Sequence, residues 1–165
     1  MSVEPVGADL ARDSLAALRS RGQTLGTAES LTAGLLSASI ASVPGASDVL
    51  RGAVVSYATD VKTSLLGVPE QVVTEHGVVS AECAEAMATG ARRVLAVTWA
   101  ASTTGVAGPD EQEGHAVGTV YVAVAGPDVV QVQSLALYGS RQQIRDDAVV
   151  AALRLLTATC TSGGG

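Results

Sequence analysis

The chain has 165 residues, of which 47% are apolar and 16% are charged, so it is large enough to bury a core and is not intrinsically disordered. One Trp, three Tyr and no Phe are present, which predicts a core built from Ala, Val and Leu. The net charge of −6, without any run of Lys or Arg, argues against a concentrated basic face, so we predict no nucleic-acid partner.

Cysteine spacing and hydropathy narrow the class of protein further. Cys83 and Cys160 lie far apart without Cys-x-x-Cys spacing, which predicts neither a zinc site nor a disulfide framework. His76 and His115 are isolated, so we expect no metal site. The acidic segment 1–9 lacks the apolar region of a signal peptide, and no apolar run reaches membrane-spanning length. We expect a cytoplasmic protein that does not bind membranes.

The first third of the chain predicts alternating helices and strands. Apolar residues recur at helical spacing over 8–20, and a short strand is predicted over 24–28. A helix rich in Ala, Ser and Leu follows over 31–42 and is broken by the Pro-Gly pair at 44–45. The apolar run 52–57 predicts the next strand.

The middle of the chain predicts three helices and a strand. Segments 59–66 and 69–76 predict two short helices, each followed by glycine. Ser80 is the predicted N-cap of the clearest helix, whose apolar stripe reaches Leu95. The run 98–104 predicts a strand that ends at a glycine-rich loop.

The last third predicts a hairpin and a long helix. The nearly continuous apolar run 118–125 is typical of a central strand covered on both faces. After the turn at 126–128, the run 129–137 returns as its antiparallel partner, and its alternating Gln residues predict an edge position. Ser140 is expected to cap a helix that continues to about Thr159.

Together these elements predict an α/β fold, a three-layer α/β/α sandwich with a mixed, mostly parallel sheet. We expect one domain over 1–165, with disordered tails at 1–7 and 161–165.

Ser30 opens the most informative segment, Thr27 to Gly34. It follows a predicted strand and precedes a predicted helix, so its hydroxyl is expected beside the free N–H groups of a helix start. Nucleophilic serines favour this geometry, because the oxyanion then meets donors already in place. An ordinary helix N-cap would show the same pattern. Glu29 can cap the helix start or orient a partner.

Tyr57 and Lys62 form a second candidate site. They flank the end of a predicted strand, so both side chains can face one cleft at the end of the sheet. A lysine acts as a general base when burial lowers its pKa, and a tyrosine hydroxyl can relay a proton. An exposed Lys on a short helix beside a Tyr at a strand end is the alternative.

Two further segments can hold a ligand. Thr104 to Pro109 follows a predicted buried strand, and its glycines let backbone N–H groups approach a phosphate or carboxylate, although a tight turn would use the same residues. Arg141 and Arg145 lie one turn apart on the last predicted helix and can hold a phosphate or face the solvent.

The motifs, taken in order, resemble the CinA C-terminal domain family from about residue 8 to 159. The resemblance is carried by Ala28-Glu29-Ser30-Leu31-Thr32-Ala33-Gly34, Val43-Pro44-Gly45-Ala46-Ser47, Arg51-Gly52-Ala53-Val54-Val55-Ser56-Tyr57, Leu65-Leu66-Gly67-Val68, His76-Gly77-Val78-Val79-Ser80, Thr104-Gly105-Val106-Ala107-Gly108-Pro109 and Val117-Gly118-Thr119-Val120. The family includes amidases that hydrolyse nicotinamide mononucleotide to nicotinate mononucleotide and ammonia, in pyridine-nucleotide recycling.

The resemblance implies a compact α/β/α domain, commonly dimeric, that needs no cofactor and acts on a small nucleotide. Longer relatives carry a preceding domain that resembles molybdopterin-binding proteins, so we expect a stand-alone form here. Residue by residue, the catalytic positions fall on Ser30, Lys62 and Tyr57, and the expected substrate-binding positions are Glu29, Thr32, Gly34, Thr104, Gly105, Ala107, Gly108 and Arg141.

This sequence departs from the family pattern at three places. Ala33 stands where the family usually has Gly, and Thr59 or Asp60 takes the place of an Asn between Tyr57 and Lys62. The loop 110–116 is shorter and acidic, with His115 where the family has Lys. The sequence thus leaves three hypotheses: this amidase, a nucleotide-binding module without turnover, and an amidase for another small carboxamide.

Overall fold

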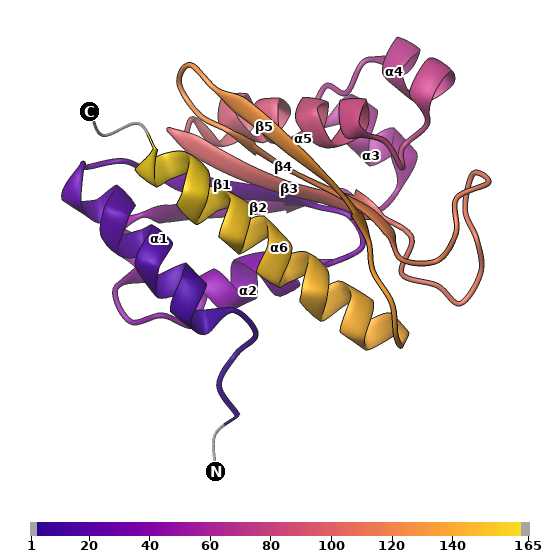
Figure 1. Ribbon diagram of the computed structural model, residues 1–165. Helices are drawn as coiled ribbons and strands as arrows, with labels where there is room; N and C mark the ends of the chain where they lie inside the picture. Colours follow the sequence, from indigo (N-terminus) through magenta and orange to yellow (C-terminus); the bar gives the residue numbers. More distant parts are fainter. Residues whose placement is uncertain (1–2, 163–165) are drawn as a thin grey trace.

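The computed structural model describes residues 3–162, which form a five-stranded sheet between two layers of helices (Figure 1). The strand order is β2-β1-β3-β4-β5. The strands are β1 (Leu25–Glu29), β2 (Leu50–Val55), β3 (Trp99–Gly105), β4 (Thr119–Ala125) and β5 (Val130–Ala136).

The sheet is mixed, as predicted. β1 pairs in parallel with β2 and β3, whereas β4 pairs antiparallel with β3 and β5. Two strand pairs are therefore parallel and two are antiparallel. Both antiparallel pairs involve β4, which is the one strand that runs against the other four. The residues of β4 from Val122 onward are buried, and β5 is an edge strand, as the apolar run and the alternating Gln residues predicted.

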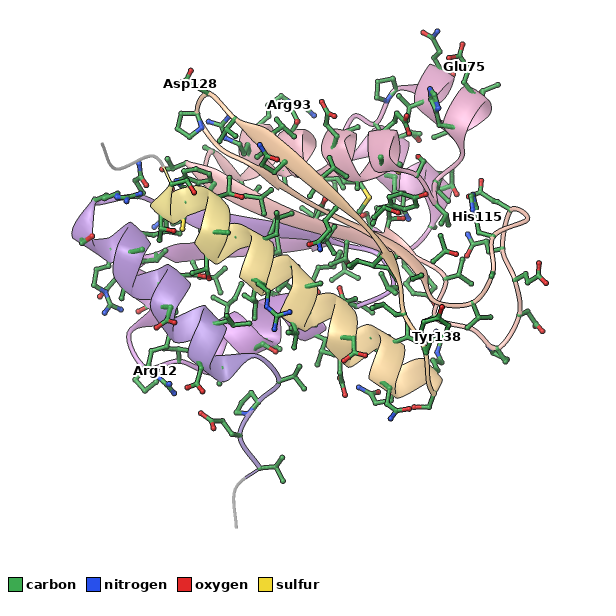
Figure 2. All side chains as sticks on the ribbon, viewed as in Figure 1. Arg12, Glu75, Arg93, His115, Asp128 and Tyr138 are labelled. Carbon is green, nitrogen blue, oxygen red and sulfur yellow. The ribbon has the colours of Figure 1, made fainter. Side chains whose placement is uncertain are left out.

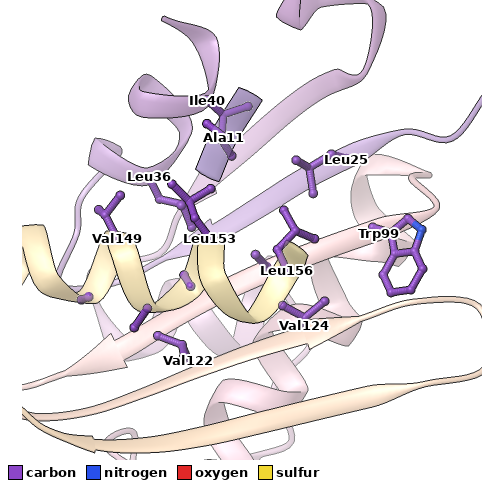
Figure 3. Packing of buried hydrophobic residues seen from close by; sticks show 14 of the residues in the cluster. Ala11, Leu25, Leu36, Ile40, Trp99, Val122, Val124, Val149, Leu153 and Leu156 are labelled. Carbon is purple, nitrogen blue, oxygen red and sulfur yellow. The ribbon is translucent and has the colours of Figure 1, made fainter. Parts of the chain in front are cut away.

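One face of the sheet is covered by α1 (Ala8–Ser20), α2 (Leu35–Ala41) and α6 (Arg141–Thr161) (Figure 1). Leu36 and Ile40 of α2 pack with Leu153 and Leu156 of α6 over the sheet, which Figure 3 shows from close by. The cluster is almost wholly aliphatic, because a chain without Phe can fill this space only with branched and small side chains. The predicted capping of the last helix is confirmed, since Ser140 and Gln143 form a reciprocal capping box.

The opposite face is covered by α5 (Ala81–Leu95), with α3 (Thr59–Ser64) and α4 (Glu70–His76) beside it (Figure 1). Ser80 caps α5 as predicted, and its hydroxyl accepts the N–H of Cys83 at 3.1 Å. The buried residues of α5 and of the loop after α3 belong to a second hydrophobic core on this face of the sheet. The short 3₁₀ helix η1 (Ala46–Asp48) precedes β2.

Two expectations need correction. The helix predicted from Leu31 begins four residues later, at Leu35. Residues 31–34 form turns in which hydrogen bonds join residues three apart, as from Ala33 N–H to the Ser30 carbonyl oxygen, in place of the bonds between residues four apart that define an α-helix. The predicted disordered tails lie partly outside the described residues, and Thr161 belongs to the last turn of α6. Among residues 3–162, no helix combines the length and hydropathy that a membrane crossing requires.

Candidate active site

The carboxyl ends of four strands meet at one edge of the sheet. β1, β2 and β3 are mutually parallel, and β5 runs in the same direction. Ser30, Tyr57 and Arg141, which follow β1, β2 and β5, therefore arrive at the same edge as the loop after β3. The topology explains how residues far apart in the sequence can form one site.

Glu29, the last residue of β1, is fully buried and fixes the start of α2. Its Oε1 accepts the N–H groups of Gly34 at 3.1 Å and Leu36 at 2.8 Å, and its Oε2 accepts that of Ser37 at 3.0 Å. The hydroxyls of Thr27 and Thr32 also donate to this carboxylate, at 3.0 and 2.7 Å. A carboxylate at a helix N-terminus satisfies otherwise free N–H groups and interacts favourably with the helix dipole.

Ser30 contacts Lys62 directly. Lys62 Nζ lies 2.9 Å from Ser30 Oγ, 2.7 Å from the carbonyl oxygen of Ser56 and 3.2 Å from that of Tyr57. The amine thus has three acceptors, one for each N–H of an ammonium group, and together they fix its position. In the neutral amine, two N–H groups can remain on the carbonyls while the lone pair accepts the Ser30 O–H.

Burial makes the neutral form of Lys62 easier to reach. The side chain is only 1% exposed, and this burial lowers the pKa of Lys62 below its usual 10.5, against opposing effects from Cys83 and Glu113. Burial also raises the pKa of Cys83 to about 11, so this thiol carries no charge at pH 7 that would hold a proton on Lys62. Lys62 is the only lysine of the chain, a signal that the sequence carried.

Tyr57 and Arg141 face each other across the site. Arg141 Nη2 donates to the Tyr57 hydroxyl at 3.1 Å, and Arg141 Nη1 donates to the carbonyl oxygen of Gly108. The Tyr57 side chain is 58% exposed, and its main chain holds Lys62. The Tyr57 hydroxyl therefore accepts from Arg141 and keeps its own proton available for donation.

Ser30, Tyr57 and Arg141 line a pocket of about 170 Å³. The part of the lining predicted from the sequence comprises Ser30, Tyr57, Gly105, Ala107, Gly108 and Arg141, and the remaining lining residues are Leu31, Val106, Asp110 and Gln112. The predicted serine, tyrosine and glycine-rich loop thus share one pocket. Asp110 and Gln112 come from the loop in which the sequence departs from its relatives.

Four predicted substrate-binding residues do not line the pocket. Glu29 and Thr32 are fully buried and hydrogen-bonded to each other, and the Gly34 N–H is donated to the same carboxylate. The buried Thr104 hydroxyl donates to the carbonyl oxygen of Val78 at 2.6 Å. The structure thus uses these polar groups for hydrogen bonds inside the protein.

The expected oxyanion donors also need correction. The first N–H groups of α2 are donated to Glu29, so the helix start cannot stabilise an oxyanion at Ser30. The N–H groups of Leu31 and Ala107 have no acceptor within residues 3–162, and both residues line the pocket. The free N–H donors beside Ser30 are thus those of the next residue and of the glycine-rich loop.

The acidic loop between β3 and β4 is anchored by Glu113. Its carboxylate accepts the N–H groups of Val78 and Val79, each at 3.0 Å, and so ties the loop to the segment before α5. Figure 2 shows His115 on this loop, which projects beyond the end of the sheet. Within the described part of the chain, no three His, Cys, Asp or Glu side chains cluster closely enough to hold a metal ion.

Comparison with known proteins places the chain in a family. The family described as CinA C-terminal domain matches residues 7–160. The chain belongs to this family. A CinA-like protein of Frankia casuarinae is 49% identical over 142 residues, which cover 86% of this chain and 33% of that protein. A putative competence-damage inducible protein of Limosilactobacillus fermentum is 44% identical over 151 residues, covering 90% and 36%. The chain thus spans about a third of these CinA relatives.

Solved structures of the CinA superfamily share the fold. Competence damage-inducible protein A from Klebsiella pneumoniae superposes with a TM-score of 0.92 at 26% identity, covering 96% of this chain and 99% of that one. Competence/damage inducible protein CihA from Agrobacterium tumefaciens gives 0.90 at 33% identity, covering 96% and 98%. The resemblance to the CinA C-terminal domain and the predicted α/β fold are thereby confirmed.

Proposed function

We propose that this protein is a serine amidohydrolase that converts nicotinamide mononucleotide to nicotinate mononucleotide and ammonia, in pyridine-nucleotide recycling. One observation carries the proposal: the buried Lys62 Nζ lies 2.9 Å from Ser30 Oγ at the wall of a pocket. A nucleophile within hydrogen-bond reach of a base whose pKa is lowered is the arrangement that covalent catalysis needs.

In the first step, Ser30 Oγ bonds to the carboxamide carbon while its proton passes to Lys62. The carbonyl oxygen becomes an oxyanion, which the N–H groups of Leu31 and Ala107 stabilise. The C–N bond then breaks, and the nitrogen leaves as ammonia with the proton that Lys62 received, passed either directly or through the Tyr57 hydroxyl, which gives its own proton and regains one from Lys62; Lys62 is then neutral again. An acyl ester on Ser30 remains.

In the second step, water attacks the ester carbon and gives its proton to Lys62. The C–O bond to Ser30 breaks, Ser30 regains a proton from Lys62, and the carboxylic acid product leaves. The two carbonyl groups that hold Lys62 keep the amine in place through both proton transfers.

The phosphate of the substrate is assigned to the glycine-rich loop and Arg141. Gly105, Ala107, Gly108 and Arg141 line the pocket with Ser30. A guanidinium binds a phosphate with two parallel hydrogen bonds, and here it would exchange its contacts with Tyr57 and Gly108 for the ligand.

A second candidate is a nucleotide-binding module without turnover. The observation that favours it is the acidic Asp110 in the pocket lining, which lowers the expected affinity for a phosphate. An amidase for another small carboxamide is favoured by the same residue, because an uncharged substrate avoids this repulsion.

Ammonia release and calorimetry with the purified protein separate these functions. The proposal predicts ammonia from nicotinamide mononucleotide, and faster than from a panel of uncharged carboxamides. Tight binding of the nucleotide without ammonia would support the binding module. Ammonia from the uncharged carboxamides alone would replace the proposed substrate and keep the proposed chemistry.

A further inference from the structure

The Arg145 side chain reaches from α6 to the turn that follows Ser30. Its Nε donates to the carbonyl oxygen of Leu31 at 2.9 Å, and its Nη2 donates to that of Thr32 at 3.1 Å. Its Nη1 is 3.3 Å from Gln142 Oε1 on its own helix. All three nitrogens of the guanidinium thus have acceptors in the protein, which corrects the expectation that Arg145 holds a phosphate or faces the solvent.

These contacts fix the direction of a peptide group beside the nucleophile. A trans peptide is planar, so its N–H points opposite to its C=O. Because the Thr32 carbonyl points toward Arg145, the Ala33 N–H of the same peptide points away from Arg145. The Ser30 carbonyl accepts the N–H of Ala33 at 3.0 Å, which likewise fixes the Leu31 N–H.

The Leu31 N–H has no acceptor among the residues that the structure describes, and Leu31 lines the pocket beside Ser30. A free donor directly after a nucleophile is suited to an oxyanion, and its value depends on being held in place before the reaction. The turn 31–34 has no regular helical hydrogen bonds of its own, whereas α6 is a 21-residue helix anchored in the core by Ile144 and Ala148. The rigid element is therefore α6.

We propose that Arg145 is a positioning residue: it holds the Leu31 and Thr32 carbonyl groups, and with them the turn after Ser30, so that the Leu31 N–H stabilises the oxyanion formed at Ser30 together with the Ala107 N–H. This inference rests on the proposed function, because it takes Ser30 as the nucleophile. The planar guanidinium serves two adjacent carbonyls with two donors of fixed spacing, which a lysine ammonium cannot reproduce. The role therefore requires arginine, and not merely a positive charge.

Labelling of Ser30 by a small alkyl fluorophosphonate tests the inference without a known substrate. Ser30 Oγ bonds to phosphorus, fluoride leaves, the proton passes to Lys62, and the charge that develops on the phosphoryl oxygen needs the same donors. The labelling rate is measured by mass spectrometry of the intact protein. We expect Arg145→Ala to be labelled about 10-fold to 100-fold more slowly, and Arg145→Lys to be slowed as well.

Arg154→Ala is the matched control, because Arg154 is an exposed residue of the same helix. It should be labelled at the wild-type rate. Guanidinium chloride at a few millimolar should restore part of the rate of Arg145→Ala and leave Arg154→Ala unchanged. If Arg145→Ala does not fold, as judged by circular dichroism, Arg145→Lys takes its place in the comparison of rates.

The outcomes separate the two proposals. Wild-type protein without a label on Ser30 would overturn the nucleophile, and with it the role of Arg145. Labelling of wild type and folded Arg145 variants at equal rates would overturn the role of Arg145 alone. With an active substrate, a fall in kcat at nearly constant KM supports positioning, whereas a rise in KM at constant kcat would contradict it.

Discussion

Lys62 Nζ and Ser30 Oγ lie 2.9 Å apart, although the two residues are separated by 32 positions in the sequence. The contact depends on the parallel pairing of β1 and β2, which brings the ends of both strands to one edge, and on α3, which returns Lys62 to that edge. Ser56 and Tyr57 complete the arrangement through their carbonyl groups.

The first prediction concerns pH and activity. Catalysis needs the neutral amine of Lys62, and burial lowers its pKa below 10.5, so kcat/KM should rise with pH and level off above this lowered pKa. Because Lys62 is the only lysine, protein labelled with ¹³C-lysine gives one side-chain resonance whose titration measures the pKa directly. A side-chain pKa at or above 10.5 would contradict the base role.

The same lowered pKa predicts how stability depends on pH. Between the lowered pKa and 10.5, the unfolded chain binds more protons at Lys62 than the folded protein does, so the free energy of unfolding should rise with pH in this window. Urea denaturation of wild type and Lys62→Met at several pH values measures the effect. The difference in unfolding free energy between the two proteins should change in favour of wild type as pH rises, and an opposite change would contradict it.

The second prediction separates Tyr57 from Arg141. Tyr57→Phe keeps the carbonyl that holds Lys62 and removes the hydroxyl, so kcat should fall about 100-fold with unchanged stability. Arg141→Ala should mainly raise KM, because its assigned partner is the phosphate. Steady-state kinetics of both variants decide the roles. A Tyr57→Phe variant with full kcat would exclude proton donation by Tyr57.

The third prediction concerns the buried carboxylate. Glu29→Gln replaces one of the accepting oxygens with an NH₂ group that faces donors, so it should destabilise the protein by about 2–4 kcal/mol. Glu85→Gln changes an exposed carboxylate of α5 and should change stability by less than about 0.5 kcal/mol. Urea denaturation compares the two variants, and equal stabilities would contradict the capping role of Glu29.

The fourth prediction concerns Gly90 of α5. Alanine normally stabilises a helix relative to glycine by about 1 kcal/mol, but a Cβ here would lie 2.0 Å from the carbonyl oxygen of Leu66. Gly90→Ala should therefore destabilise the protein by about 1–3 kcal/mol and reduce activity, because the displaced segment follows the helix that carries Lys62. Thr89→Ala, at the adjacent exposed position, is the control. A stabilised Gly90→Ala would show that α5 and this segment are not packed as described.

Much of the fold could be predicted from local patterns in the sequence. The apolar run of β4, the alternating Gln residues of β5 and the Ser80 and Ser140 caps each depend on residues close together in the chain, and the structure confirms them. The start of α2 could not be predicted in this way. Its first N–H groups are satisfied by Glu29, which lies outside the helix and across a turn.

The candidate site was predictable only in part, for the same physical reason. The types of Ser30, Lys62 and Tyr57 suggested chemistry, but the contact between Ser30 and Lys62 depends on strand pairing, which no local pattern specifies. Arg145 looked like an exposed helix residue, because its carbonyl partners lie more than a hundred positions away. Conversely, Glu29 and Thr104 looked like binding residues, but both are buried, and their side chains are hydrogen-bonded to the nearby Thr32 and to the distant Val78.

Ammonia release from nicotinamide mononucleotide, compared between wild type and Ser30→Ala, tests the central claim most directly. Ser30→Ala removes the hydroxyl and leaves the carbonyl contacts of Lys62 in place, so the fold should be retained. The account predicts release by wild type and a loss of at least about 1,000-fold in kcat for Ser30→Ala. A folded Ser30→Ala variant that releases ammonia at the wild-type rate would contradict it.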